Sequence, residues 1–298
     1  ISNFTDFNAL EVIPGVSVRY VKTVRELKNP DMIVLPGSKN TMEDLLWLRQ
    51  NGLEAAILKL ADRRVPVWGI CGGYQMMGEV LVDEKGVESD LPSRTSGMGL
   101  LPLKTEFEKA KIRTQVEGAF GQLDGCLGGL SGKSIEGYEI HMGRTYIDRE
   151  EGAADTARIV SWRREPEICR PMDYVMETGK DRLSSRQARM DGWNRGNIYG
   201  TYVHGIFDSP GIAGAVAEAL AAAKGLCLEQ AADMDYRTYR QQQYDKLAEE
   251  LRENLDMAAV YRIMDISQKG KMGISRKGKG EEKPDDGYTV GTGTAGRY

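Results

Sequence analysis

The chain has 298 residues, a formal net charge of −4 and 41% hydrophobic residues, so it is long enough to bury a large core in one large or two modest domains. Its charge balance gives no electrostatic case for binding nucleic acid or an anionic membrane. No apolar run approaches the roughly 20 residues of a membrane span, and no signal peptide opens the sequence.

The first 65 residues alternate between strand-like and helix-like patterns. Residues 16–21 and 31–35 have the β-branched, apolar character of strands. Thr41 is typical of a helix cap, with Asp44 three residues later, and residues 52–63 carry the apolar stripe of a second helix. This alternation predicts an α/β fold, with a doubly wound, mostly parallel sheet flanked by helices and its site beyond the carboxyl ends of the strands.

The stretch around Cys71 combines a buried strand with a glycine-rich turn. Residues 65–70 are apolar and predict a parallel strand, and residues 74–82 predict a helix. The glycines directly after Cys71 permit a sharp strand-to-helix turn, as in a nucleophile elbow, and the N-terminus of the helix favours a thiolate. We therefore expect a nucleophilic cysteine here. The alternative is an inert, buried cysteine beside a structural turn.

The middle of the chain changes character, because helical patterns fade after residue 97. Residues 99–103, 112–120 and 134–141 predict strands that are antiparallel and lie at one margin of the sheet. Residues from about 150 to 196 are charged and irregular, with short strand candidates at 158–161 and 174–176. We interpret most of this region as a surface insertion.

The last third of the chain returns to regular patterns and then loses them. Residues 197–203 predict a buried strand that delivers His204, and residues 210–224 and roughly 236–264 predict helices. Residues from 268 onward are rich in Gly and Lys and cannot bury enough apolar surface to offset the entropy of ordering them. We expect one domain over residues 1–265, including extra C-terminal helices, and a disordered tail over residues 266–298.

Cysteine and histidine usage restricts the chemistry. The four cysteines are scattered without C-x-x-C spacing, which argues against a zinc site or a disulfide framework and fits the reducing cytoplasm. With only two histidines, a His-rich metal site is excluded, and no metal is expected. A cysteine nucleophile needs a base, and His204 ends a predicted central strand as Cys71 does, whereas His141 ends a marginal one. The alternative for either histidine is a structural, hydrogen-bonded role.

Several motifs resemble a known family. The run G-I-C-G-G-Y-Q at residues 69–75 resembles the nucleophile motif of class I glutamine amidotransferases, and L-P-G-S at residues 35–38 resembles their oxyanion loop. More narrowly, the runs at residues 1–7, 137–143 and 200–208 are similar to those of the cobyric acid synthase branch. The likeness covers nearly all of residues 1–265 except the insertion.

The resemblance implies a glutaminase in which Cys71 attacks the side-chain amide of glutamine and forms a thioester. His204 would act as base and then as acid, and the backbone N–H groups of Gly37 and Gly72 would bind the oxyanion. The residues expected to contact substrate glutamine are Gln75, Tyr138, Glu139 and His141. Most class I enzymes have Pro-Glu after the histidine, but Gly205 and Ile206 stand there in this chain. The third member of the triad is therefore missing or supplied from elsewhere.

The resemblance also implies partners. In this family an N-terminal, ATP-using synthetase domain transfers the ammonia to the corrinoid adenosylcobyrinic acid a,c-diamide. This sequence has no G-x-x-x-x-G-K-S/T phosphate loop and begins with Ile1 rather than Met, so we expect a fragment or processed form without that domain. No cofactor is expected in this chain. ATP and Mg are expected on the synthetase domain.

Three alternatives remain open at this stage. A related amidotransferase, acting on cobyrinic acid or on a cell-wall precursor, would share Cys71 and His204 but should lack the run at residues 137–143 and the start at residues 1–7. A non-catalytic binding module would need an unreactive Cys71. A different Cys–His hydrolase is disfavoured by Gln75 and by the loop at residues 36–37.

Overall fold

The structure is a computed structural model that describes residues 3–88, 93–147, 160–162, 190–228 and 235–263. The chain divides into two compact units, Ile1–Gln242 and Gln243–Tyr298. Helix α7 (Tyr236–Asn254) begins in the first unit and continues into the second, which also contains α8 (Met257–Ile263). No helix in the described ranges is long and apolar enough to cross a membrane.

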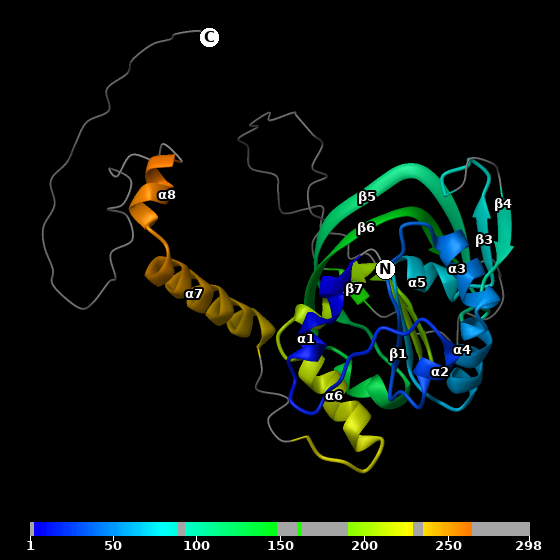
Figure 1. The fold of residues 1–298 in the computed structure, drawn as a ribbon. Helices are drawn as coiled ribbons and strands as arrows, with labels where there is room; N and C mark the ends of the chain where they lie inside the picture. The colour runs from blue at the N-terminus through cyan, green and yellow to red at the C-terminus, as the bar shows by residue number, and fades with distance from the viewer. Residues whose placement is uncertain (1–2, 89–92, 148–159, 163–189, 229–234, 264–298) are drawn as a thin grey trace, which may run out of the picture. The chain divides into compact units, whose positions relative to one another are not determined.

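A four-stranded sheet forms the centre of the first unit (Figure 1). Its order is β1 (Ile33–Leu35), β2 (Val67–Ile70), β10 (Ile198–Thr201) and β9 (Trp193–Arg195). Strand β2 pairs in parallel with both β1 and β10, and every residue of β2 and β10 is buried. The near-continuous apolar sequence of these strands is typical of a parallel sheet covered on both faces. This parallel centre, with its helices, confirms the α/β fold.

The helices of the first unit pack around this sheet. Helix α4 buries the apolar stripe that its sequence predicts, at Leu53, Ile57 and Ala61. The short helix α5 packs against β1, β2 and β10. The helices are η1 (Phe4–Phe7), α1 (Asn8–Glu11), α2 (Val24–Leu27), α3 (Thr41–Gln50), α4 (Leu53–Asp62), α5 (Gly72–Met76), η2 (Gly125–Leu130), η4 (Ile206–Asp208) and α6 (Ile212–Ala222).

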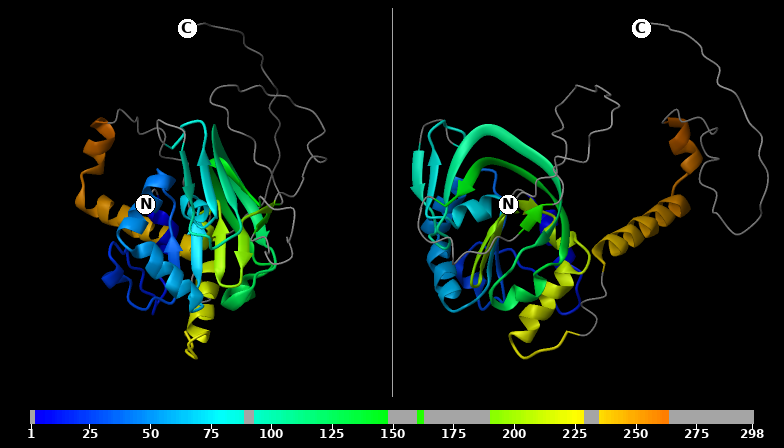
Figure 2. Two further views of the ribbon diagram at one scale, coloured as in Figure 1. Left: turned by 90° about the vertical axis from the view of Figure 1, so that its right-hand side faces the viewer. Right: turned by 180° about the vertical axis from the view of Figure 1, so that it is seen from behind.

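A second, largely antiparallel sheet lies beside the first. Its order is β11 (Val203–His204), β6 (Ser134–Tyr146), β5 (Lys104–Phe120), β3 (Val80–Asp83) and β4 (Ser93–Ser96), and β7 (Val160–Trp162) pairs with β5 and with β8 (Met190–Asp191). The right-hand view of Figure 2 shows β5 and β6 as long curved strands. The expected antiparallel pairing of this region is confirmed, but it forms a separate sheet rather than a margin of the parallel one.

Two expected elements near the N-terminus differ. Residues 16–21 form no strand; together with β1 and other segments they line a cavity of about 1080 Å³. The predicted helix over residues 74–82 ends with α5 at Met76, and β3 begins at Val80. Residues 80–82 are apolar, and two of the three are β-branched valines, which favours a strand, and β3 satisfies its backbone by pairing with β4 and β5.

Residues 99–103 also form no strand. The amides of Leu100 and Leu101 bond to the carbonyl of Met77, so this segment caps the C-terminal end of α5 instead of entering a ladder. At α3, the cap is Asn40, whose side chain accepts from the amide of Glu43, and Thr41 is the first helical residue.

The strand predicted over residues 197–203 is split. Strand β10 ends at Thr201, and β11 (Val203–His204) joins the second sheet by pairing with β6. His141 lies in the interior of β6 rather than at its end. The helix at residues 210–224 is confirmed as α6, and the one at 236–264 is interrupted between α7 and α8. The strand candidate at 174–176, most of the insertion and the tail at 266–298 lie outside the described residues.

Candidate active site

Cys71 sits on a sharp turn between β2 and α5. Its backbone is at φ 51° and ψ −109°, a region that non-glycine residues rarely adopt, so the turn is strained. Hydrogen bonds hold it on both sides, because the amide of Cys71 donates to the carbonyl of Thr201 at 2.8 Å and its carbonyl accepts from the amide of Gln75 at 3.0 Å. The expected elbow geometry at Cys71 is therefore present.

The two glycines after Cys71 are required by close packing rather than by an unusual φ. A Cβ on Gly73 would lie 2.0 Å from the carbonyl oxygen of Leu35, and one on Gly72 would lie 2.8 Å from the amide nitrogen of Ser38. The elbow thus packs directly against β1 and the turn that follows it. The structure brings Gly72 and the turn at residues 36–38 together, as the oxyanion prediction requires.

The turn at residues 36–38 is anchored to helix α3. The hydroxyl of Ser38 donates to the carboxylate of Asp44, in the first turn of α3. The side chain of Thr41 donates to Oε1 of Gln75 at 3.0 Å, which ties α3 to α5. These bonds fix the oxyanion turn relative to the elbow.

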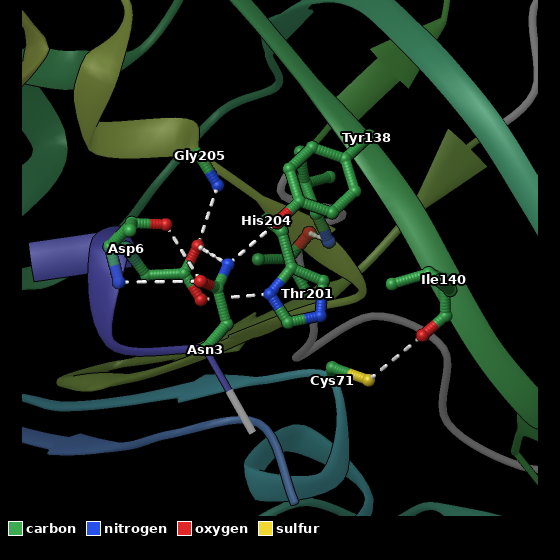
Figure 3. Close-up of polar contacts among 10 residues, drawn as sticks. Asn3, Asp6, Cys71, Tyr138, Ile140, Thr201, His204 and Gly205 are labelled. Carbon is green, nitrogen blue, oxygen red and sulfur yellow. Dashed lines mark hydrogen bonds and ion pairs between the residues drawn. The ribbon is translucent and has the colours of Figure 1, made fainter. Parts of the chain in front are cut away.

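His204 is held by a carboxylate from the opposite end of the chain (Figure 3). Nδ1 of His204 lies 2.8 Å from Oδ2 of Asp6, and both side chains are almost fully buried, at 2% and 1% exposed. The other oxygen of Asp6 accepts from the amide of Gly205 and from Nδ2 of Asn3, each at 2.9 Å. The carboxylate therefore receives two further donors besides the imidazole, which stabilise its charge.

The pKa of the His204 imidazole lies well above its ordinary value. Burial lowers the pKa of His204, but hydrogen bonds to Asp6 and Cys71 and the charges of both groups outweigh burial and raise the pKa from 6.5 to about 9. Because Nδ1 faces Asp6, Nε2 is the nitrogen left for Cys71. Figure 3 shows Asp6 on one side of the imidazole and the sulfur of Cys71 on the other.

Asp6 is the functional residue that sequence reasoning missed. It is 198 positions from His204 in the chain and comes from η1, so no local spacing links the two. A signal existed in the run at residues 1–7, whose single acidic residue lies between two phenylalanines. A carboxylate from elsewhere in the chain thus contacts the imidazole, although no glutamate follows His204, and its part in a triad stays a prediction.

Strand β6 covers the sulfur of Cys71. The thiol donates to the backbone carbonyl of Ile140 at 3.7 Å, and the Cys71 residue is 7% exposed. Tyr138, two residues earlier on β6, stacks on the His204 ring with centroids 5.3 Å apart. The same strand therefore contacts both the nucleophile and the base.

The other predicted substrate contacts gather around Tyr202. The side-chain nitrogen of Gln75, Nε2, donates to the carbonyl of Met142 at 2.9 Å and to the hydroxyl of Tyr202 at 3.1 Å. The ring of His141 stacks on that of Tyr202 at 3.6 Å, and its Nε2 lies 4.0 Å from a carboxylate oxygen of Glu139. Gln75, Glu139 and His141 are all buried, and their contact with glutamine stays a prediction. No cluster of three metal-ligating side chains occurs in the described ranges.

Comparisons with known proteins identify the family of this chain. The family model "CobB/CobQ-like glutamine amidotransferase domain" matches residues 1–212. Two relatives, both named cobyric acid synthase, come from Ruminiclostridium cellulolyticum and Lachnoclostridium phytofermentans. The first is 48% identical over 265 residues, covering 89% of this chain and 47% of the relative, and the second is 43% identical with 89% and 48% covered.

A solved glutamine amidotransferase structure matches 68% of this chain and 85% of its own length, with 13% identity and a TM-score of 0.41. The fold assignment rests on the strand order above and not on this likeness. The chain spans about half the length of the curated relatives it matches. From the family match over residues 1–212, this chain belongs to the CobB/CobQ-like glutamine amidotransferase domain family.

Proposed function

We propose that this chain is the glutaminase part of a cobyric acid synthase. It would release ammonia from glutamine for the ATP-dependent amidation of adenosylcobyrinic acid a,c-diamide in cobalamin biosynthesis. The observation that carries the proposal is the strained elbow at Cys71 beside an imidazole whose Nδ1 is held by buried Asp6 at 2.8 Å. The name and similarity of the relatives support the choice of pathway.

In the reacting form the thiol proton of Cys71 resides on Nε2 of His204, and the sulfur attacks the side-chain carbonyl carbon of glutamine. A carbon–sulfur bond forms, and the carbonyl π electrons move to the oxygen. Backbone N–H groups of Gly37 and Gly72 would stabilise this oxyanion, and loss of one such donor typically costs about 10²–10³ in rate. Asp6 stabilises the imidazolium that forms.

In the second step the carbon–nitrogen bond breaks and the leaving amide nitrogen takes the proton from Nε2 of His204, giving ammonia and a glutamyl thioester. The raised pKa of about 9 keeps His204 protonated at neutral pH, which suits this acid role. Water then attacks the thioester with His204 as base. The carbon–sulfur bond breaks and glutamate leaves, and the proton that His204 took from water restores the starting pair of Cys71 and His204.

The substrate pocket in this proposal lies between α5 and β6. Gln75, Tyr138, Glu139 and His141 would surround the bound glutamine, and β6 would move slightly from Cys71, since the thiol now bonds to the carbonyl of Ile140. ATP, Mg and the corrinoid would bind an N-terminal synthetase domain, and ammonia would pass to it. The scattered cysteines of the sequence favour action in the cytoplasm.

A non-catalytic module is a poorer explanation of the same residues. A buried charged pair is costly to desolvate, and a strained backbone at Cys71 adds a further cost. Both features together are expected at a reacting centre. A related amidotransferase would share this chemistry and differ in its acceptor.

Reaction with 6-diazo-5-oxonorleucine, a glutamine analogue with an electrophilic carbon, tests the nucleophile. We expect label on Cys71 only, no label in Cys71→Ala, and normal labelling in Cys227→Ser, which alters an exposed cysteine. Glutamate release should be absent in Cys71→Ala and His204→Ala. Label on another cysteine with Cys71 untouched would overturn the assignment.

The acceptor is tested by adding the N-terminal half of the Ruminiclostridium cellulolyticum relative with ATP and adenosylcobyrinic acid a,c-diamide. We expect glutamine-dependent corrinoid amides, detected by mass spectrometry. Labelling of Cys71 without any corrinoid amidation would contradict the cobyric acid synthase assignment and leave the glutaminase chemistry intact.

A further inference from the structure

The amide of Asn3 connects the carboxylate of Asp6 to the ring that covers His204. Nδ2 of Asn3 donates to Oδ1 of Asp6 at 2.9 Å and to the hydroxyl of Tyr138 at 2.6 Å. An amide nitrogen has two N–H groups, so these two contacts use its full donor capacity. Figure 3 shows the side chain of Asn3 between the other two groups.

The orientation of this amide is fixed by its oxygen. Asn3 is the N-cap of η1, and its Oδ1 accepts from the amide of Thr5 at 3.3 Å and from the hydroxyl of Thr5 at 2.7 Å. If the amide were reversed, its oxygen would face the Asp6 carboxylate and its nitrogen would face a backbone N–H. The cap therefore directs both N–H groups toward Asp6 and Tyr138.

Tyr138 is constrained from two directions. It pairs with His204 across the β6–β11 ladder, and its ring lies nearly parallel to the imidazole at 17°, with centroids 5.3 Å apart. The residue is still 37% exposed, so the core alone does not fix its ring. The bond from Asn3 holds the hydroxyl end of the ring.

We propose, on the basis of the proposed glutaminase function, that Asn3 and Tyr138 are positioning residues for the His204–Asp6 pair. Asn3 holds Oδ1 of the Asp6 carboxylate, the oxygen that does not face the imidazole, and Tyr138 fixes the plane of the imidazole. The face of the tyrosine ring also stabilises the imidazolium, because an aromatic face attracts a cation. Neither residue takes part in bond making; each keeps Nε2 directed at Cys71.

Variants of Asn3 separate the bridge from the cap. Asn3→Ser keeps an acceptor suited to capping η1 but loses the bridge, and we expect kcat for glutamine hydrolysis to fall about tenfold with KM changed less than about threefold. Asn3→Asp keeps the cap and places a second carboxylate beside Asp6, so kcat should fall about 10²-fold. Unchanged kcat in Asn3→Ser would show that Asn3 serves only as a cap.

Variants of Tyr138 separate stacking from hydrogen bonding. Tyr138→Phe keeps the ring, and we expect kcat to fall about threefold. Tyr138→Leu removes the aromatic face, and we expect the pKa of His204 to drop by roughly one pH unit. A Tyr138→Leu protein with an unchanged His204 titration would overturn the role given to the ring.

The pKa is read by NMR titration of the imidazole signals. The chain has only two histidines, and His141→Gln assigns the remaining signal to His204. The pH dependence of Cys71 alkylation by iodoacetamide provides a second reading. Neither measurement needs glutamine, so they decide the positioning role even if the wild-type chain proves to have no glutaminase activity.

Discussion

The proposed nucleophile and the proposed base of this site are held in different ways. Cys71 is held by backbone packing, because Gly72 lies directly against Ser38 and Gly73 lies directly against Leu35. His204 is held by side chains, with Asp6 bonded to its ring and Tyr138 stacked on it. Backbone packing follows from the fold itself, whereas side-chain support can be removed without loss of the fold. Substitutions on the two sides should therefore fail differently.

The largest effect is expected for Gly73→Ala. Its new Cβ would lie 2.0 Å from the carbonyl oxygen of Leu35, so the elbow would have to move. We expect a loss of about 4 kcal/mol, or roughly 10 °C in Tm, together with loss of glutaminase activity. Gly129→Ala is the matched control, because a Cβ there meets nothing within 4 Å. Equal melting temperatures for the two variants would contradict backbone packing as the support of Cys71.

Asp6→Asn should inactivate the enzyme without unfolding it. The amide cannot stabilise the imidazolium and permits the wrong tautomer of His204, so kcat should fall about 10³–10⁴-fold, as in other triads of this kind. The melting curve should remain cooperative. Asp31→Asn, which removes an exposed carboxylate near Lys224, should keep full activity. A fully active Asp6→Asn variant would rule out Asp6 as the third triad member.

The same variant should change the pH profile. With a pKa of about 9, wild-type His204 stays protonated at neutral pH and loses its proton as the pH rises through 9, so activity should fall on that alkaline side. Asp6 raises this pKa, so in Asp6→Asn the alkaline fall should move to lower pH. The folded pKa lies above the unfolded value, so the stability that His204 contributes is complete below pH 6.5 and lost toward pH 9. An alkaline limb at the same pH in both proteins would contradict this coupling.

His141→Ala should have a smaller effect than loss of His204. Its ring stacks on Tyr202, away from the His204–Asp6 pair, so we expect KM for glutamine to rise about tenfold and kcat to change less than about threefold. Steady-state kinetics beside His204→Ala make the comparison. Equal losses of kcat for both histidines, with KM unchanged, would overturn this division of roles.

The smallest effect is expected at Asp208, next to the His204 side of the site. Burial raises the pKa of Asp208 to about 6, and its Oδ1 has no hydrogen-bond partner in the described part of the chain. Asp208→Asn removes a charge that is unfavourable at pH 7.5, so Tm should rise by a few degrees, about 2 °C. At pH 5 the wild-type carboxyl is protonated and the gain should disappear. A gain of equal size at both pH values would show that the charge is not responsible.

The sequence was informative where a local pattern decides the structure. The apolar run before Cys71 and the glycines after it lead to a buried parallel strand and an elbow, and α4 and α6 follow their apolar periodicity. The sequence was misleading where the structure of a segment depends on the distant strands with which it can pair. Residues 80–82 look helical next to the elbow but form part of β3, and residues 16–21 look like a strand but join neither sheet in the described chain.

By itself, then, the sequence determined the parallel centre of the fold and indicated Cys71 and His204 as the proposed nucleophile and base, because each depends on neighbouring residues and on a period of two or 3.6. Only the tertiary structure decided what holds His204. Asp6 and Asn3 come from the first turn of the chain and Tyr138 from β6, and their contacts with the base arise only when two sheets and η1 pack together. Asp6 and His204 are 198 residues apart in the sequence, so no local pattern links them and only the folded structure shows that they are in contact.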